Sequence, residues 1–162
     1  KITPQEAYIK AIDKEDIRVT MQNAGIPMEF LEEAGKQDRA AKLARAQAMR
    51  EDLRARLAAN DADVGTLNDL AWLLATCPLD EIRSGKDALR LAERARDLTN
   101  GQEPAVLDTL SAAYAENGRF SRAIEIARKA VTIAAERHDA ATVGSLHMRI
   151  KDYTQNRPYR EV

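Results

Sequence analysis

The stretch that decides the fold is LDTLSAAYAENGRFSRAIEIARKA, residues 107–130. Apolar and small residues recur in both of its halves at the three- and four-residue spacing of an α-helix. Asn117-Gly118 separates the halves as a turn-forming pair, and Pro104 upstream marks where the first helix begins. The stretch therefore predicts one helix from Pro104 to Glu116 and a second that runs to about Arg137.

The same pattern occurs again upstream. Its first helix carries Leu67, Leu70, Ala71 and Leu74 at the spacing of Leu107, Leu110, Ser111 and Tyr114, and its second carries Ala88, Ala92 and Ala95 at the spacing of Ala123, Ala127 and Ala130. A weaker third copy is formed by Leu31, Gly35, Ala40 and Ala44. Repetition at a period of about 35 residues is typical of stacked helical repeats.

These residues resemble the tetratricopeptide repeat, whose pattern is W-x2-L-G-x2-Y followed by a column of alanines. The resemblance implies an all-α fold, a short right-handed solenoid of helical hairpins. In such folds small residues let paired helices approach closely. The stretch LAWLLATCP, residues 70–78, resembles a variant found in large bacterial repeat proteins, where the repeats often form the C-terminal part of a longer polypeptide.

The repeats divide the chain into five parts. We expect residues 1–27 to form N-terminal helices that cap or dock, and residues 28–63 to form a degenerate unit, with a short helix that stops at Gly35 and a long one from about Asp38 to Ala59. Residues 64–103 and 104–137 form the two clear units, the first opened by a capping box at Thr66. Residues 138–162 form a capping helix and a tail, with Arg149, Lys151 and Asp152 facing water.

Composition agrees with a folded helical chain. The sequence has 162 residues, 29 of them alanine and only 7 aromatic, with a net charge of −1. No apolar run is long enough to cross a bilayer. The single cysteine, Cys77, leaves the redox compartment open. The first residue is not Met, so the chain is either a piece of a longer protein or a processed one. This leaves only a slight preference for the bacterial periplasm over the cytoplasm.

The sequence predicts no catalytic site, no metal site and no cofactor. His138 and His147 are nine residues apart, so they do not share a helix face as an i, i+4 metal pair does. Cys77 precedes Pro78 at a helix end without a neighbouring histidine to activate it, which is typical of a structural thiol. No glycine-rich phosphate loop is present. We therefore expect a protein that binds rather than one that catalyses.

The resemblance implies a protein-protein interaction scaffold or adaptor, with the first helix of each unit lining a concave face that accepts a peptide or a partner helix. The candidate partner-binding residues are Asn68, Trp72, Thr76, Asp108, Ala112 and Glu116. Trp72 is the strongest candidate because large aromatic residues anchor interfaces, although packing against a neighbouring helix would explain it equally well. Two carboxylates on this face favour a neutral or basic partner.

Two alternatives remain open. The chain could be the C-terminal regulatory or targeting module of a multidomain enzyme, because this hypothesis requires the same fold. It could also bind nucleic acid, because residues 36–60 carry a net charge of +4 that includes Arg50 and Arg54. A solvated helix face that pairs with its own acidic neighbours is the simpler explanation of that charge, and no aromatic residues are interleaved to stack on bases.

Overall fold

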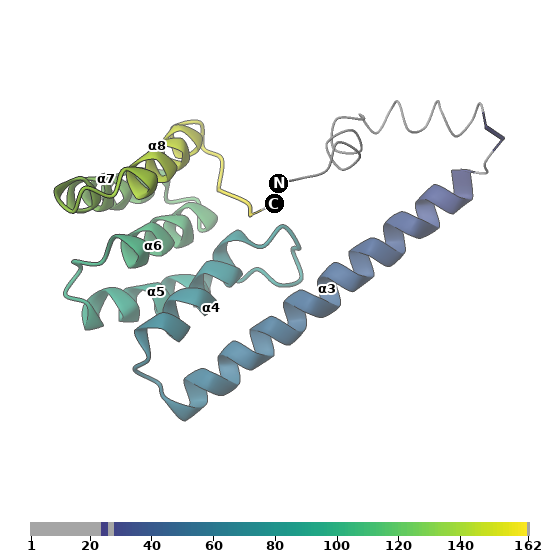
Figure 1. Cartoon of the computed structure of the whole chain (residues 1–162), viewed down its shortest axis with the longest axis horizontal. Coiled ribbons are helices and arrows are strands. Elements are labelled where there is room, and N and C mark those ends of the chain that lie inside the picture. The colour runs from purple at the N-terminus through teal and green to yellow at the C-terminus, as the bar shows by residue number, and fades with distance from the viewer. Residues whose placement is uncertain (1–23, 26–27, 162) are drawn as a thin grey trace. The chain divides into compact units, whose positions relative to one another are not determined.

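The structure, a computed structural model, describes residues 24–25 and 28–161. All regular secondary structure in these residues is α-helix (Figure 1). The helices are α3 (Met28–Ala59), α4 (Val64–Thr76), α5 (Gly85–Leu98), α6 (Pro104–Glu116), α7 (Phe120–Glu136) and α8 (Ala140–Thr154). The prediction of an all-α chain is therefore confirmed for the described residues. The predicted N-terminal helices, in residues 1–27, lie outside them apart from residues 24–25.

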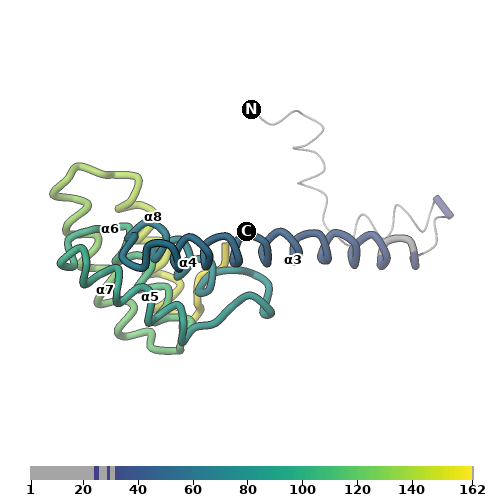
Figure 2. The backbone as a smooth tube through the Cα atoms, turned by 90° about the horizontal axis from the view of Figure 1, so that it is seen from below, coloured from purple at the N-terminus to yellow at the C-terminus, as the bar shows by residue number. Residues whose placement is uncertain are grey.

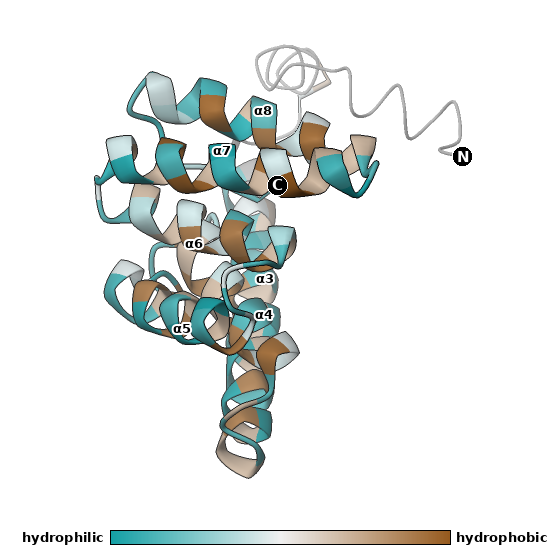
Figure 3. Ribbon diagram, turned by 90° about the vertical axis from the view of Figure 1, so that its left-hand side faces the viewer, coloured by the Kyte–Doolittle hydropathy of each residue, from teal (hydrophilic) through white to brown (hydrophobic). Residues whose placement is uncertain are grey.

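The chain divides into two compact units, residues 1–44 and 45–162. Within the second unit each helix from α4 to α8 packs against the next, and α4 also packs directly against α6. The backbone folds back and forth in this unit (Figure 2), and α5, α6, α7 and α8 lie one above another (Figure 3). Direct packing of α4 on α6 places the two helices with similar leucine spacing side by side.

Small residues form the contacts between paired helices. The predicted alanines of α5 and α7 are all completely buried, namely Ala88, Ala92, Ala95, Ala123, Ala127 and Ala130. Leu67, Leu107 and Leu110 are equally buried in α4 and α6. A methyl side chain allows two helix backbones to approach closely, and the larger leucines fill the space between neighbouring pairs. This alternation of small and large residues explains why the packing is regular.

The turns follow the glycine and asparagine signals in the sequence. Asn100, Gly101 and Gly118 have positive φ angles of 52°, 62° and 72°. Asparagine and glycine are the residues that adopt this left-handed conformation most readily at helix ends. The predicted turn at Asn117-Gly118 is therefore confirmed, and α5 ends at a similar pair, Asn100-Gly101.

Two predicted helix boundaries are wrong. The helix does not stop at Gly35, because α3 runs without interruption from Met28 to Ala59. A single glycine lowers helix stability by only about 1 kcal/mol, which the surrounding helix formers offset. Residues 28–63 are therefore one helix and a loop rather than a hairpin. The cap of α4 is Asp63 rather than Thr66, since its carboxylate accepts the Thr66 N–H at 3.2 Å.

Overpacking one of the buried alanines tests the helix contacts. We expect Ala127→Leu to lower the free energy of unfolding by about 1 to 3 kcal/mol, because the added carbons have no space between closely packed helices. Urea unfolding followed by circular dichroism measures the change. Ala135→Leu is the matched control, because Ala135 is exposed on the same helix. Equal stability of the two variants would contradict close packing at Ala127.

Candidate functional site

Helices α4 and α6 present four of the predicted residues on neighbouring helix faces. Asn68 and Trp72 are four residues apart on α4, and Asp108 and Glu116 are eight residues apart on α6, so each pair shares one side of its helix. Asn68 and Trp72 are half-buried, and the side chains of Asp108 and Glu116 are largely buried. We call this surface, together with Arg149 of α8, the α4–α6 face. Thr76 and Ala112 belong to the same helix sides but are buried.

Asp108 and Arg149 form the central ion pair of the α4–α6 face. The Arg149 Nη1 and Asp108 Oδ2 atoms are 3.1 Å apart, and the side chains are only 13% and 15% exposed. Burial raises the pKa of the Asp108 carboxyl to about 6, and the positive charge of Arg149 counteracts part of this rise. The prediction that Arg149 faces water is wrong, because its side chain reaches from α8 to α6.

The Arg149 guanidinium also contacts two aromatic rings that contact each other. Its central carbon is 5.0 Å from the centroid of Trp72 and 4.8 Å from that of Tyr159. The ring centroids of Trp72 and Tyr159 are themselves 5.6 Å apart. A cation near an aromatic face contributes from about 0.5 to 2 kcal/mol as it becomes desolvated. Trp72 therefore packs against both a charged and an aromatic group, one from α8 and one from the tail.

Glu116 joins the face to the loop between α4 and α5. Its Oε1 atom is 3.1 Å from Arg83 Nε, and both side chains are largely buried. Arg83 also donates from Nη1 to the Cys77 carbonyl at 2.7 Å and pairs with Asp80. The second Glu116 oxygen, Oε2, is 2.6 Å from Arg160 Nη2. One carboxylate is thus shared by an arginine of the repeat and an arginine of the tail.

The segment after α8, residues 158–161, lies across the C-terminal end of α4 (Figure 1). The Glu161 N–H donates to the Thr76 carbonyl at 2.9 Å. The Trp72 Nε1–H donates to Glu161 Oε2, also at 2.9 Å. Tyr159 and Arg160 are half-buried in these contacts. The chain's own tail therefore occupies the face that the sequence predicts to bind a partner.

The tail also completes the end of α4. The last four carbonyl groups of a helix have no partner within it. Here Leu73 accepts from the Cys77 N–H and Leu74 from the Ser84 N–H, at 3.2 and 3.0 Å. The remaining two accept from the tail, Ala75 from Arg160 Nη1 at 3.4 Å and Thr76 from the Glu161 N–H. Residues far away in the sequence thus satisfy the helix end that Pro78 prevents from continuing.

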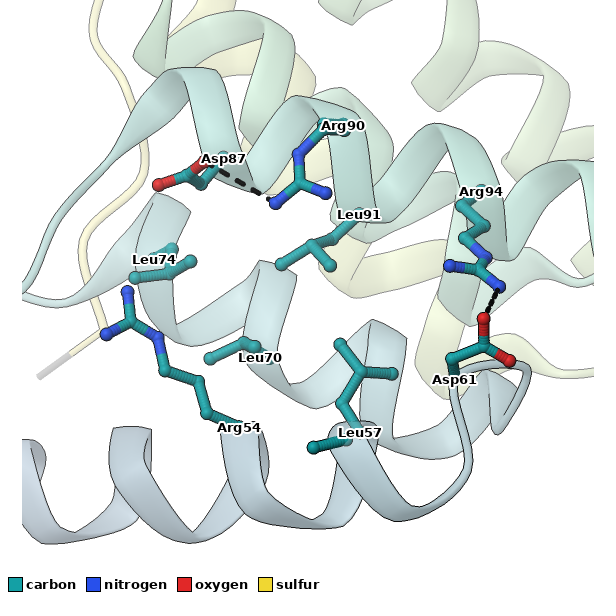
Figure 4. A pocket seen from close by; sticks show the side chains of 10 residues that line it. Arg54, Leu57, Asp61, Leu70, Leu74, Asp87, Arg90, Leu91 and Arg94 are labelled. Atoms are coloured by element: carbon teal, nitrogen blue, oxygen red, sulfur yellow. Dashed lines mark hydrogen bonds and ion pairs between the residues drawn. The ribbon is translucent and has the colours of Figure 1, made fainter.

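Apart from the α4–α6 face, the structure has a hollow between the end of α3, α4 and α5 (Figure 4). It has a volume of about 400 Å³ and is lined by leucines, among them Leu57, Leu70 and Leu91. Arginines stand around it, of which Arg94 pairs with Asp61 at 2.7 Å and Arg90 with Asp87 at 3.6 Å. This hollow is separate from the α4–α6 face, and the sequence did not predict it.

Three basic residues of α3 pair with acidic neighbours on the same helix. Lys36 lies near Glu33 at 3.9 Å, Lys42 near Asp38 at 2.8 Å and Arg56 near Asp52 at 3.9 Å. Arg50 is half-buried on the side of the helix that carries the buried Leu53. These contacts favour the interpretation of a solvated helix face over a continuous basic surface for nucleic acid.

The residues considered for catalysis or metal binding are not brought together. Cys77 is buried, whereas His138 and His147 are exposed on or near α8. Among residues 24–25 and 28–161, no three histidine, cysteine or acidic side chains are close enough to hold a metal ion. None of the helices in this range has the length and apolar content needed to cross a membrane.

Comparison of the chain with family models, curated proteins and solved structures gives no match in any of the three sets.

The raised pKa of Asp108 makes stability depend on pH. The folded chain keeps a proton on Asp108 up to about pH 6, whereas the unfolded chain loses it near about pH 4, so the folded state binds more protons between these values. The stabilisation of the folded state by this proton is complete below about pH 4 and is lost as the pH rises through 6. Relative to Asp108→Asn, we expect the wild-type free energy of unfolding to fall by on the order of 2 kcal/mol from pH 4 to 7.

Urea unfolding at several pH values measures this difference. Asp61→Asn is the control because its carboxylate is exposed, and this variant should keep the wild-type dependence. Parallel pH profiles of the wild-type and Asp108→Asn chains would contradict a buried, proton-binding Asp108.

Proposed function

We propose that the chain is a non-catalytic protein-protein interaction module that binds an extended segment of another protein on the α4–α6 face. One observation carries the proposal: an extended segment, the chain's own residues 158–161, already lies on this face. That segment makes a backbone hydrogen bond, an aromatic contact and an ion pair, which are the kinds of contact that peptide recognition uses.

The packing of the chain supports a scaffold of tetratricopeptide type. The alanine columns of α5 and α7 are buried, and the first helices of two successive repeats lie directly against each other. Such scaffolds hold their inner helices rigidly, so that little conformational entropy is lost from the binding surface when a partner binds. A module of this kind serves equally well as an adaptor in a complex and as the targeting part of a longer protein.

The face also offers chemistry that discriminates between partners. Trp72 provides a large ring, and aromatic residues and arginines are the commonest energetic anchors of interfaces. Asp108 and Glu116 are each matched by an arginine of the fold, namely Arg149 and Arg83. Each of these carboxylates therefore has a cationic neighbour in the fold, and a partner has to fit the individual donors and acceptors of the face.

Selection from a random peptide library tests the proposal. The library is presented to the full chain and to the full chain with Arg160→Ala, which removes one contact that holds the tail. We expect enriched peptides to bind about ten-fold more weakly, or not at all, when Trp72→Ala is added. Isothermal titration measures the affinities, and circular dichroism checks that each variant is folded.

The hollow between α3, α4 and α5 provides the control for this experiment. Arg54→Ala with Arg90→Ala changes the rim of the hollow between α3, α4 and α5 and should leave peptide binding unchanged. Peptides that are insensitive to Trp72→Ala but lost with the arginine pair would place binding in that hollow and contradict the proposal. A selection that enriches no peptide on either chain would also contradict it.

A further inference from the structure

We infer that the tail is a resident competitor on the α4–α6 face, and that the partner is a protein segment in which an aromatic residue is followed directly by arginine. This inference rests on the proposed function and specifies its ligand and its regulation. The chemistry of the partner follows from the groups that the tail satisfies, which are considered in turn.

The first of these groups is a cation acceptor. Glu116 Oε1 is taken by Arg83, so Oε2 is the oxygen that faces the tail, and its close contact is Arg160 Nη2 at 2.6 Å. Arg160 reaches the Ala75 carbonyl with its other terminal nitrogen, Nη1, at 3.4 Å. A planar guanidinium can reach two acceptors in this way, whereas the single ammonium of lysine is a point charge. The site therefore favours arginine over lysine.

The second group is the aromatic platform next to it. The rings of Trp72 and Tyr159 both contact the Arg149 guanidinium, at 5.0 and 4.8 Å from its central carbon, and their centroids are 5.6 Å apart. Arg149 is held in place by Asp108, so half of this arrangement exists without the tail. An aromatic residue one position before the arginine completes it. Beside Tyr159 a hollow of about 180 Å³ lined by Met148 and Asp152 leaves room for a longer segment.

The third requirement comes from the main chain. The Thr76 carbonyl at the end of α4 accepts the Glu161 N–H, and the Trp72 indole N–H donates to the Glu161 carboxylate. A partner segment supplies the same backbone N–H and an acceptor in the residue after its arginine. Together the three requirements describe an extended aromatic-arginine-acceptor triplet, of which Tyr159-Arg160-Glu161 is the version carried by this chain.

The contacts of the tail are of the kind that a partner can displace. Tyr159 and Arg160 are only half-buried, Glu161 is exposed, and its hydrogen bond to Trp72 lies at the surface. Segments with few buried contacts and exposed hydrogen bonds open at low free-energy cost. The tail nevertheless competes strongly, because a segment joined by a short linker has an effective concentration in the millimolar range. Occupancy by a partner therefore requires a tighter segment or a released tail.

Titration of the full chain with a peptide of residues 156–161, Asn-Arg-Pro-Tyr-Arg-Glu, tests the inference. The fluorescence of Trp72, the only tryptophan, reports binding at the face itself. We expect the full chain with Tyr159→Ala and Arg160→Ala to bind the peptide at least ten-fold more tightly than the wild-type chain, whose own tail competes. Gln155→Ala is the matched control, because Gln155 is exposed and precedes the segment that contacts the face, so this variant should behave as wild type.

Variants of the peptide test its chemistry on the same chain. Replacing the arginine at the position of Arg160 by alanine should weaken binding at least ten-fold, and replacing it by lysine should weaken it less. Equal affinity of the wild-type and tail-altered chains, equal affinity of the alanine and arginine peptides, or no binding of the peptide would each overturn the inference. Peptides from the library that bind both chains equally would overturn the inference while leaving the proposed function standing.

A measurement on the unaltered chain covers the case in which the tail variant does not fold. A spin label on the first residue of the peptide should broaden the NMR signal of the Trp72 indole N–H in the wild-type chain at millimolar peptide, and excess unlabelled peptide should restore the signal. An indole signal that is unaffected at these concentrations would overturn the inference.

Discussion

The ion pair between Asp108 and Arg149 organises the α4–α6 face. It joins α6 to α8 with both side chains largely buried, where a lost partner leaves an uncompensated charge. Because Arg149 is fixed by Asp108, it gives the rings of Trp72 and Tyr159 a fixed cation against which both pack. Three helices and the tail thus meet at one guanidinium group, and the geometry of the face depends on its position.

The unfinished end of α4 is the second constraint on this region. Pro78 prevents the helix from continuing, and its last carbonyls then need donors from elsewhere. The loop to α5 supplies two of these donors and the tail supplies the other two. A surface segment thus completes this helix end. Under the proposed function, the same groups that stabilise α4 recognise a segment from another chain.

The helices of residues 104–136 could be predicted from the sequence because their signals are local. Pro104, Asn117-Gly118 and the alanine columns each act within one helix or turn, and the structure confirms them. The position of Arg149 could also have been found, since it lies three residues after the buried Leu146 and four before the buried Tyr153. The tail could not be predicted, because it has no periodicity. Trp72 and Glu161, which it brings together, are 89 residues apart.

The charges buried on the α4–α6 face have a consequence for the kinetics of association. Asp108 and Glu116 are balanced by Arg149 and Arg83, so the two carboxylates and two guanidinium groups sum to zero. A neutral surface exerts no long-range attraction on an approaching molecule, and its association rate responds little to ionic strength. Recognition on this face is then decided after collision, by fit at short range. Differences between ligands should accordingly reside in how long each stays bound rather than in how fast it arrives.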